Sequence, residues 1–278
     1  MDKIAIVAST RDTASMNIMD NLCELVTFEN TGIMFMGNEI KYCKELDSYL
    51  VVIDEDLIFA NRIDELPLET NRLIFLSKHA SESGIPSLLV HFPGNWTKDN
   101  RMGGNPRAFS IADPVVHKAL TMALVERKKD GLIPPEFMVG NEVTHHGPTI
   151  NRACTFIEIG STPDRWRDRA VGRIVAECLI EGISNMQKYE GNEVWIGFGG
   201  PHYAPKFHDY LLNKQIMLGH IAPKYVIDMI DEEVVSLAMS RCLIRPKGAL
   251  IDWKGMKSKQ REKIINILDS LGVSYKRI

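Results

Sequence analysis

A series of short apolar runs, separated by polar or glycine-rich segments, limits the folds open to this chain more than any other feature. Lys3 to Ser9, Tyr49 to Ile53, Leu73 to Leu76 and Ser87 to Phe92 are rich in Ile, Val, Leu and Phe. Such runs are typical of strands covered on both faces, so they predict a substantial central sheet. Similar runs occur at Ile33 to Met36, Phe137 to Thr144, Thr155 to Ile159, Val194 to Phe198 and Ala249 to Asp252.

Segments with helical spacing lie between these runs. Apolar side chains recur at helical intervals from about Asp12 to Val26. Asp113-Pro114 and Thr162-Pro163 each have a capping side chain followed by proline, so they predict helices that end at Lys129 and at about Lys188. Two more helices are expected around Glu232 to Arg241 and over Ser258 to Leu271, after a stretch from Gly199 to Pro223 that is punctuated by Gly and Pro.

Strands that alternate with helices predict an α/β fold. We expect a three-layer α/β/α arrangement with a mostly parallel or mixed central sheet. Because we find no repeat, low-complexity tract or clear linker, residues 1–278 are predicted to form a single compact unit. The alternative is two fused α/β halves, 1–135 and 136–278. A monomer is expected, since no long amphipathic helix is left without a partner.

Composition agrees with a globular protein, because 45% of the residues are hydrophobic and 25% are charged. The five cysteines form no CxxC pair and are interpreted as reduced core residues. No apolar run approaches the roughly 20 residues of a membrane span. The first apolar run is also shorter than the apolar region of a signal peptide, so a soluble cytoplasmic protein is expected. The net charge of -3 argues against binding polyanions by overall charge and leaves room for a local basic patch.

Five of the eight histidines lie beside glycine, proline or a predicted strand end. Imidazole is a natural zinc ligand and titrates near neutral pH, so histidines carried by loops suit a metal site or an acid–base site. No HExxH or other local zinc motif is present, so the ligands would have to converge from separate loops. The competing interpretation is that each histidine pins its own turn by hydrogen bonds. These five are His91, His145, His146, His202 and His220.

Glu158 lies inside the apolar run FIEIG. An ionised carboxylate there is costly unless it is paired or binds a metal, and burial alone would raise its pKa toward the range of a general base. Gly160 ends the run, which places Glu158 near the carboxyl edge of a strand, where open α/β sheets have their sites. The alternative is an outward-facing, solvated side chain.

Gly199 and Gly200 follow a predicted strand and precede His202. A dinucleotide site is not expected, because His202 stands where such a loop has its third glycine. The backbone N–H groups of these glycines are candidates for holding an oxyanion or a phosphate. No Walker motif or GxSxG elbow occurs.

Cations and one aromatic side chain suggest contacts with nucleic acid. Trp96 lies among glycines and near Lys98, where it could stack on a base while cations hold phosphates. Arg165, Arg169 and Arg173 recur along one helix face and are interpreted as ordinary helical ion pairs.

Eight short blocks together resemble one family, the archaeal and plant-type D-aminoacyl-tRNA deacylases. The matching blocks extend from about residue 15 to residue 255, so the resemblance covers nearly the whole chain. They are SxNIM (Ser15 to Met19), SKHAS (Ser77 to Ser81), HFPGNW (His91 to Trp96), THHGPT, FIEIGS, GGPHYAP, GHIAPKY and DWKG (Asp252 to Gly255).

The resemblance implies an enzyme that hydrolyses the ester between a D-amino acid and the terminal adenosine of tRNA, a proofreading reaction that recycles mischarged tRNA. It also implies zinc as cofactor and a fold similar to that of peptidyl-tRNA hydrolases and purine nucleoside phosphorylases. The individual roles below are hypotheses that follow from the resemblance.

In these hypotheses zinc polarises the ester carbonyl or activates water, and Glu158, His146 or His202 moves a proton. Gly199 and Gly200 would hold the oxyanion. A rival mechanism uses the 2'-hydroxyl of the substrate's ribose and leaves zinc a structural role. The candidate zinc ligands are His91, His145, His202 and His220, with His146, Glu158 and Asp252 as alternatives. The candidate substrate or tRNA contacts are His79, Asn95, Trp96, Lys98, Lys206, Lys224 and Lys254.

Two other functions remain open from the sequence. One is a non-catalytic module that binds the end of an RNA, in which the histidines only pin turns. The other is an enzyme of small molecules, similar to the nucleoside phosphorylases, which would ignore tRNA. Metal content distinguishes the first alternative, and a requirement for phosphate or a free nucleoside distinguishes the second.

Overall fold

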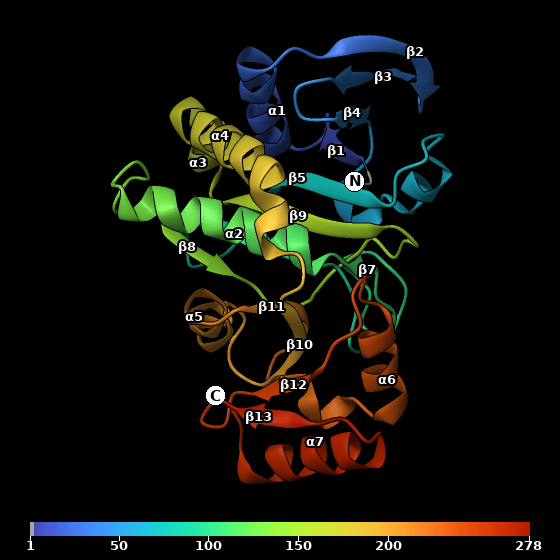
Figure 1. The fold of residues 1–278 in the computed structure, drawn as a ribbon, viewed down its shortest axis with the longest axis vertical. Helices are drawn as coiled ribbons and strands as arrows, with labels where there is room; N and C mark the ends of the chain where they lie inside the picture. Colours follow the sequence, from blue (N-terminus) through green and yellow to red (C-terminus); the bar gives the residue numbers. More distant parts are fainter. Residues whose placement is uncertain (1–2) are drawn as a thin grey trace.

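The computed structural model describes residues 3–278 and contains two sheets, one above the other in Figure 1. The first sheet is nine-stranded within the described residues and mixed, in the order β2-β3-β4-β1-β5-β9-β6-β8, with β7 paired to β9. Its strands are β1 (Ile4–Ser9), β2 (Glu29–Phe35), β3 (Asn38–Cys43), β4 (Ser48–Ile53), β5 (Arg72–Ala80), β6 (Ser87–His91), β7 (Ile111–Ala112), β8 (Met138–Asn141) and β9 (Ala153–Ser161).

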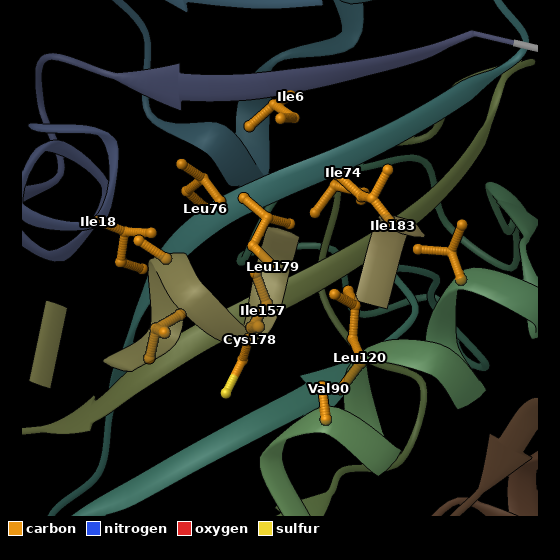
Figure 2. Packing of buried hydrophobic residues seen from close by; sticks show 14 of the residues in the cluster. Ile6, Ile18, Ile74, Leu76, Val90, Leu120, Ile157, Cys178, Leu179 and Ile183 are labelled. Atoms are coloured by element: carbon orange, nitrogen blue, oxygen red, sulfur yellow. The ribbon is translucent and has the colours of Figure 1, made fainter. Parts of the chain in front are cut away.

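Helices cover one face of this sheet (Figure 1). Figure 2 shows side chains such as Ile74 and Ile157 packed against Leu120 and Leu179 of the helices. The opposite face is covered by the short 3-10 helices η1 (Leu57–Phe59) and η2 (Asn61–Glu65) and by loops. The helices are α1 (Thr13–Leu25), α2 (Pro114–Lys129), α3 (Pro163–Arg167) and α4 (Arg169–Asn185), followed by η3 (Met186–Tyr189).

The second sheet is parallel and has the order β11-β10-β12-β13. Its members are β10 (Glu193–Phe198), β11 (Ile216–Ala222), β12 (Gly248–Ile251) and β13 (Tyr275–Arg277). One face packs on α5 (Pro205–Asn213), and the other on α6 (Glu232–Ser240), α7 (Ser258–Ser270) and η4 (Ile227–Met229). Within residues 3–278, no helix has the length and the hydropathy required to cross a bilayer.

Capping explains where the helices begin. The carboxylate of Asp113 accepts hydrogen bonds from the backbone N–H groups of Val115 and Val116, with Pro114 in the first turn, as the sequence predicts. The predicted helix from Thr162 to Lys188 is instead broken in two, because the Asp168 carboxylate caps a new helix by accepting from Ala170 and Val171.

The predicted α/β fold with a mostly parallel, mixed sheet flanked by helices is confirmed. Three details differ from the prediction. The strands form two sheets, and the alternative division near residue 135 does not match them, since β8 and β9 both belong to the first sheet. The hairpin strand β3 was not predicted, and the stretch from Gly199 to Pro223 contains both α5 and β11.

The two sheets meet through the segment that follows β8. The N–H of Val143 donates to the carbonyl of His202 (2.9 Å), and the N–H of Thr144 donates to that of Ile221 (2.9 Å). Helix α2 also spans the junction, since it packs on both β6 and β11. Backbone from both sheets is therefore held together at this point, and the polar side chains gather there.

Candidate active site

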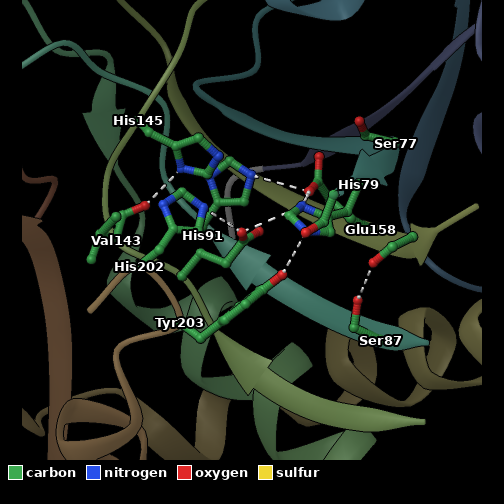
Figure 3. A network of polar contacts seen from close by, with 12 residues as sticks. Ser77, His79, Ser87, His91, Val143, His145, Glu158, His202 and Tyr203 are labelled. Carbon is green, nitrogen blue, oxygen red and sulfur yellow. Dashed lines mark hydrogen bonds and ion pairs between the residues drawn. The ribbon is translucent and has the colours of Figure 1, made fainter. Parts of the chain in front are cut away.

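The alternation of side chains along the strands places the first polar groups on the face of the first sheet that the helices leave open. Ile157 and Ile159 of β9 face the helices, so Glu158 between them projects to the opposite face. The same argument applies to His91, which follows the helix-facing Val90 in β6. Figure 3 shows Glu158 and His91 together with His79 of β5 and with His145 and His202 from loops.

Glu158 is buried, with 2% of its surface exposed. Its Oε2 lies 3.6 Å from Nδ1 of His79 and 3.6 Å from Nε2 of His91. Burial alone would raise the pKa of Glu158, but the charge of His91 and the close contacts with the His79 and His91 rings outweigh it and hold this pKa well below its usual range. The prediction of a raised pKa, which considered only burial, is therefore wrong, and Glu158 is an ionised carboxylate.

A second buried carboxylate, Glu142, directly follows β8 and is also 2% exposed. Its Oε1 accepts from Nε2 of His202 at 2.8 Å and lies 3.3 Å from Nδ1 of His79. Its other oxygen, Oε2, has no hydrogen-bond partner among the described residues. His79 thus lies between two carboxylates. Burial lowers the pKa of His79, but the hydrogen bond to Glu158 and the charges of Glu142 and Glu158 raise it overall.

Three histidines have the same hydrogen-bond arrangement. Nδ1 of His145 donates to the carbonyl of Val143 (2.9 Å), Nδ1 of His146 donates to that of Gly147 (2.6 Å), and Nδ1 of His91 donates to that of Phe92 (3.3 Å). A carbonyl oxygen only accepts, so the hydrogen of each neutral ring is on Nδ1 and the lone pair is on Nε2. Each ring therefore offers Nε2 as a ligand atom.

The three rings lie close together, with centroids 4.4 Å apart for His91 and His145, 4.8 Å for His91 and His146, and 4.4 Å for His145 and His146. Burial and the neighbouring histidine His91 lower the pKa of His146 to about 3, and burial with the charge of His146 places the pKa of His145 well below 6.5. Both rings are neutral at physiological pH, which is the form that binds metals.

Three overlapping groups have ligand atoms within 4.8 Å of one another, a spacing that suits a metal ion. The first contains only imidazoles, and the other two contain the carboxylates. Nε2 of His91 is buried without a hydrogen-bond partner in the described chain, as is Oε2 of Glu142. The groups are His91, His145 and His146; Glu142, His145 and His202; and His79, Glu142 and Glu158.

These side chains form one wall of a cavity of about 830 Å³. His79, His145, His146, Glu158 and His202 line it, whereas His91 and Glu142 lie behind them. Apolar side chains form another part of the wall, and charged groups from the first sheet and its loops stand around it. The apolar group includes Leu57, Ile58, Trp96, Met102 and Val226, and the charged group includes Asp12, Asp56, Lys78, Asp99 and Arg101.

Comparison with known proteins identifies the family. The family model for D-aminoacyl-tRNA deacylase matches residues 66–276. This chain belongs to the D-aminoacyl-tRNA deacylase family. A D-aminoacyl-tRNA deacylase of Methanocaldococcus jannaschii is 35% identical over 99% of this chain and 100% of the relative. One of Pyrococcus abyssi is 33% identical over 97% of this chain and 98% of the relative.

A solved structure agrees with the fold of this deacylase-family chain. A crystal structure described as that of a conserved protein of unknown function superimposes with a TM-score of 0.88. It is 30% identical and covers 99% of this chain and 95% of that one. The two-sheet arrangement is therefore similar to one seen by experiment.

Of the histidines predicted to bind metal in this deacylase-family chain, only His220 lies apart from the cluster. Nδ1 of His220 is 3.1 Å from the Thr144 hydroxyl, and its Nε2 donates to the carbonyls of Ser110 (3.2 Å) and Arg241 (3.0 Å). Both nitrogens are thus used inside the core, so the structure contradicts the prediction that His220 shares a metal with His91 and His145. His220 is a structural histidine, as the competing interpretation of the sequence proposed.

The glycines predicted to hold an oxyanion also lie outside the cavity wall. The N–H of Gly199 donates to the carbonyl of Ala222 (2.8 Å), so it has no hydrogen left for a substrate. Gly200 is buried beside the carboxylate of Asp252, where an added Cβ would lie 2.9 Å from Oδ2. These glycines shape the turn that carries His202, and the structure contradicts an oxyanion role for Gly199.

The residues predicted to contact tRNA do not lie together in the structure. Trp96 is only 3% exposed, and its Nε1 donates to the carbonyl of Ile221, so one edge lines the cavity and no face is free for stacking, contrary to the prediction. Asn95 lines the cavity and donates to the carbonyls of Gly103 and Asn105. His79 is in the polar cluster. Lys98, Lys206, Lys224 and Lys254 are all exposed.

Glu142, Tyr203 and Tyr225 were not predicted as site residues. The hydroxyl of Tyr203 lies 3.2 Å from Nε2 of His79, and that of Tyr225 lies 3.0 Å from Nδ1 of His202. A signal for Glu142 was present, since it is an acid at the end of an apolar run and three residues before His145. Tyr203 follows His202 directly in the sequence.

Proposed function

We propose that this chain hydrolyses the ester bond that joins a D-amino acid to the terminal adenosine of tRNA, releasing the free D-amino acid and tRNA. Membership of the deacylase family over nearly the whole chain supports the reaction class. The observation that carries the proposal is the convergence of five histidines and two buried carboxylates at one cavity. Its volume of about 830 Å³ suits a ligand of aminoacyl-nucleoside size, since small-molecule sites span about 300–1,000 Å³.

We also propose zinc as the cofactor, held by His91, His145 and His146. The supporting observations are the three Nδ1 donors, which direct each Nε2 toward its neighbours, and the buried Nε2 of His91 without a hydrogen-bond partner in the described chain. This set keeps the predicted ligands His91 and His145, adds His146, which the sequence analysis gave as an alternative ligand, and leaves out His202 and His220. Burial lowers the pKa of His91, but the charge of Glu158 raises it overall, and a bound cation would take the place of the ring proton.

Zinc bound there would polarise the ester carbonyl and lower the pKa of nearby water to about 7. The chain's own residues would handle the protons. The carboxylate of Glu142 holds Nε2–H of His202 and leaves Nδ1 as the basic nitrogen, which faces the hydroxyl of Tyr225. In this arrangement His202 accepts a proton at Nδ1 from the attacking nucleophile and returns it to the leaving ribose oxygen.

Glu158 and His79 would support this centre. Glu158 is ionised and contacts both His79 and His91, so it neutralises the positive charge that gathers at the histidines. His79 donates Nδ1–H between Glu142 and Glu158, which keeps the two carboxylates from repelling each other. We propose that His79 positions the two carboxylates, in place of the predicted contact with the substrate.

In the test, the purified protein is incubated with D-Tyr-tRNA or with L-Tyr-tRNA, and the release of tyrosine is followed. The assay is run before and after treatment of the protein with a chelator, and again after zinc is added back. Release of tyrosine from the D-ester, lost with the chelator and restored by zinc, is the expected result. Hydrolysis that survives complete removal of metal would overturn the zinc proposal and leave the deacylase proposal intact. Absence of hydrolysis by folded protein loaded with zinc would overturn the deacylase proposal itself.

We further propose that the chain acts as a monomer in the cytoplasm, where aminoacylated tRNA is used. All residues of the metal cluster come from one chain, so catalysis does not require a second copy. Sedimentation velocity at the concentration used for the activity assay tests the monomer, and an active species that sediments only as a dimer would overturn it.

A further inference from the structure

We propose that the carboxyl edge of the second sheet, beside the cavity, binds the single-stranded 3' end of tRNA, with four lysines on its phosphates and the ring of Tyr225 on a base. This inference rests on the proposed function, since it says how the nucleic-acid part of that substrate reaches the cavity. The lysines, named here the edge lysines, are Lys206, Lys224, Lys254 and Lys257.

Topology places these residues together. Strands β10, β11 and β12 are parallel neighbours, so the segments that follow them leave the sheet at the same edge. Lys206 is in the segment after β10, Lys224 is in the segment after β11, and Lys254 and Lys257 are in the segment after β12. His202 and Tyr225 belong to the first two of these segments and line the cavity. Lys224 is therefore adjacent to the cavity-lining Tyr225, and Lys206 lies four residues after His202.

Hydrogen bonds join these segments to one another. The N–H of Lys224 donates to the carbonyl of Gly200 (2.9 Å), and Nε2 of Gln260 donates to the carbonyl of Lys224 (3.0 Å). The same amide nitrogen donates to Asp228 (2.9 Å), and Oε1 of Gln260 accepts from the N–H of Lys257. The backbone that carries the edge lysines is thus fixed before any ligand binds, which lowers the entropic cost of binding.

The charges at this edge are unbalanced. All four edge lysines are exposed, and none makes an ion pair within residues 3–278. The acids of these segments include Asp252, which is 3% exposed and accepts from the N–H of Gly255, and Asp228, which is exposed and accepts from Gln260. By contrast, the arginines along α3 and α4 are paired, namely Arg165, Arg169 and Arg173 with Glu136, Glu24 and Glu177. The edge therefore carries four exposed lysines without ion pairs on a chain of net charge -3.

Tyr225 supplies an aromatic surface at the boundary between this edge and the cavity. It is 53% exposed and lines the cavity, while its hydroxyl is held at 3.0 Å from Nδ1 of His202. An exposed ring flanked by cations is the arrangement with which proteins bind single strands, because bases stack on aromatic faces while phosphates contact lysines. Trp96, the sequence-based candidate for stacking, is buried and cannot serve.

The test uses uncharged RNA, so that binding is measured apart from hydrolysis. The probes are a hairpin that ends in single-stranded CCA and the same hairpin with a blunt end, with affinity followed by fluorescence anisotropy at several salt concentrations. The variants are the four edge lysines changed together to Ala, Tyr225→Ala and Tyr225→Phe. The control changes three exposed lysines of other surfaces to Ala, namely Lys41, Lys129 and Lys188.

The edge-lysine variant should bind both hairpins at least about 10-fold more weakly. It should also show a shallower salt dependence, by about three in the log–log slope, because each of the four lost phosphate contacts removes about 0.7 to 0.9. Tyr225→Ala should weaken binding of the CCA hairpin alone by about 10-fold, and Tyr225→Phe should bind normally. The control variant should bind as the unmodified protein does. Unchanged affinity in the edge-lysine variant would overturn the inference.

Steady-state hydrolysis of D-Tyr-tRNA separates this inference from the proposed function. If the unmodified protein hydrolyses the ester, the edge-lysine variant should raise KM at least about 10-fold with little change in kcat. An unchanged KM would overturn the inference and leave the deacylase proposal standing. If the unmodified protein binds the CCA hairpin through these lysines but hydrolyses nothing, the deacylase proposal fails and the binding surface stands.

Discussion

Nε2 of His202 lies 2.8 Å from Oε1 of Glu142, although the first residue belongs to the second sheet and the other to the first. The contact joins an imidazole at the cavity wall that is 34% exposed to a carboxylate that is 2% exposed. A buried carboxylate that holds one nitrogen of a histidine fixes the tautomer and the orientation of the ring, and leaves the other nitrogen as the proton acceptor. The pair thus has the geometry of a general base.

Glu142→Gln should lower kcat for D-aminoacyl-tRNA by about 100-fold, because glutamine keeps the shape of the side chain and loses the charge that supports His202. His202→Gln should cause a loss of the same order, and the double variant should be little worse than either single one, since both act as a unit. The measurement is single-turnover hydrolysis. Glu136→Gln, at a half-exposed surface acid, is the matched control, and equal losses in the control would contradict the assignment.

Metal content should follow the imidazole cluster. His91→Gln, His145→Gln and His146→Gln should each lower zinc bound per chain, measured by inductively coupled plasma mass spectrometry, because each removes one ligand of the proposed set. His220→Gln should retain zinc, since the structure uses both of its nitrogens elsewhere. Loss of zinc in His220→Gln with normal zinc in His146→Gln would refute the proposed ligand set.

Stability should fall with pH below about 6.5. Burial lowers the pKa of His117 to about 3 and that of His220 to about 4, while both titrate near 6.5 in the unfolded chain. Above pH 6.5 neither state binds these protons. Below it only the unfolded state does, so the free energy of unfolding should drop by about 1.4 kcal/mol per pH unit for each histidine until the folded pKa is reached.

Urea denaturation at pH 7.5, 6.5, 5.5 and 4.5 tests this dependence. His220→Gln is the informative variant, because its amide can still donate to the carbonyls of Ser110 and Arg241 and cannot titrate. As the pH falls, its free energy of unfolding should decrease less steeply than that of the unmodified protein, because one fewer proton is taken up on unfolding. A stability that is constant from pH 7.5 to 4.5 is incompatible with neutral buried histidines.

Gly147→Ala should destabilise the fold by about 2–3 kcal/mol. A Cβ at this position would lie 2.2 Å from the backbone nitrogen of Gly104 and 2.3 Å from the carbonyl oxygen of Ile58, so three segments around the cavity would have to separate. Gly140→Ala is the control, because its nearest neighbour would be 3.8 Å away. The midpoint of thermal unfolding is the measurement, and equal shifts in the two variants would refute this account of the packing.

The local patterns of the sequence predict most elements, because burial and capping act within a few residues. Asp113-Pro114 begins a helix as predicted, and the apolar run around Ile157 is a central strand. The division into two sheets was not predictable, since pairing between β10 and β12 depends on residues about fifty positions apart in the chain. Strand β11 was missed because its Gly219 and His220 interrupt an apolar run.

For the candidate site too, the sequence predicts what depends on neighbouring residues and misses what depends on residues distant in the chain. Histidines beside glycine and proline did converge, as His91, His145, His146 and His202 show, because such loops lie at strand ends. His220 has the same local pattern and is a core residue, since its partners Ser110 and Arg241 are distant in the sequence. Glu142 was missed because a single acid after a strand has the same pattern whether solvated or buried.

The contact between Glu142 and His202 also bears on how such a protein can be divided or recombined. A chain that ended before β10 would keep His91, His145 and His146 with Glu142, and would lose His202 and Tyr225. Such a fragment would retain every proposed ligand of the metal and lack the partner of its buried carboxylate. Gene fission, domain exchange or proteolysis between the two sheets would therefore separate the proposed metal ligands from the proposed proton-transfer residue.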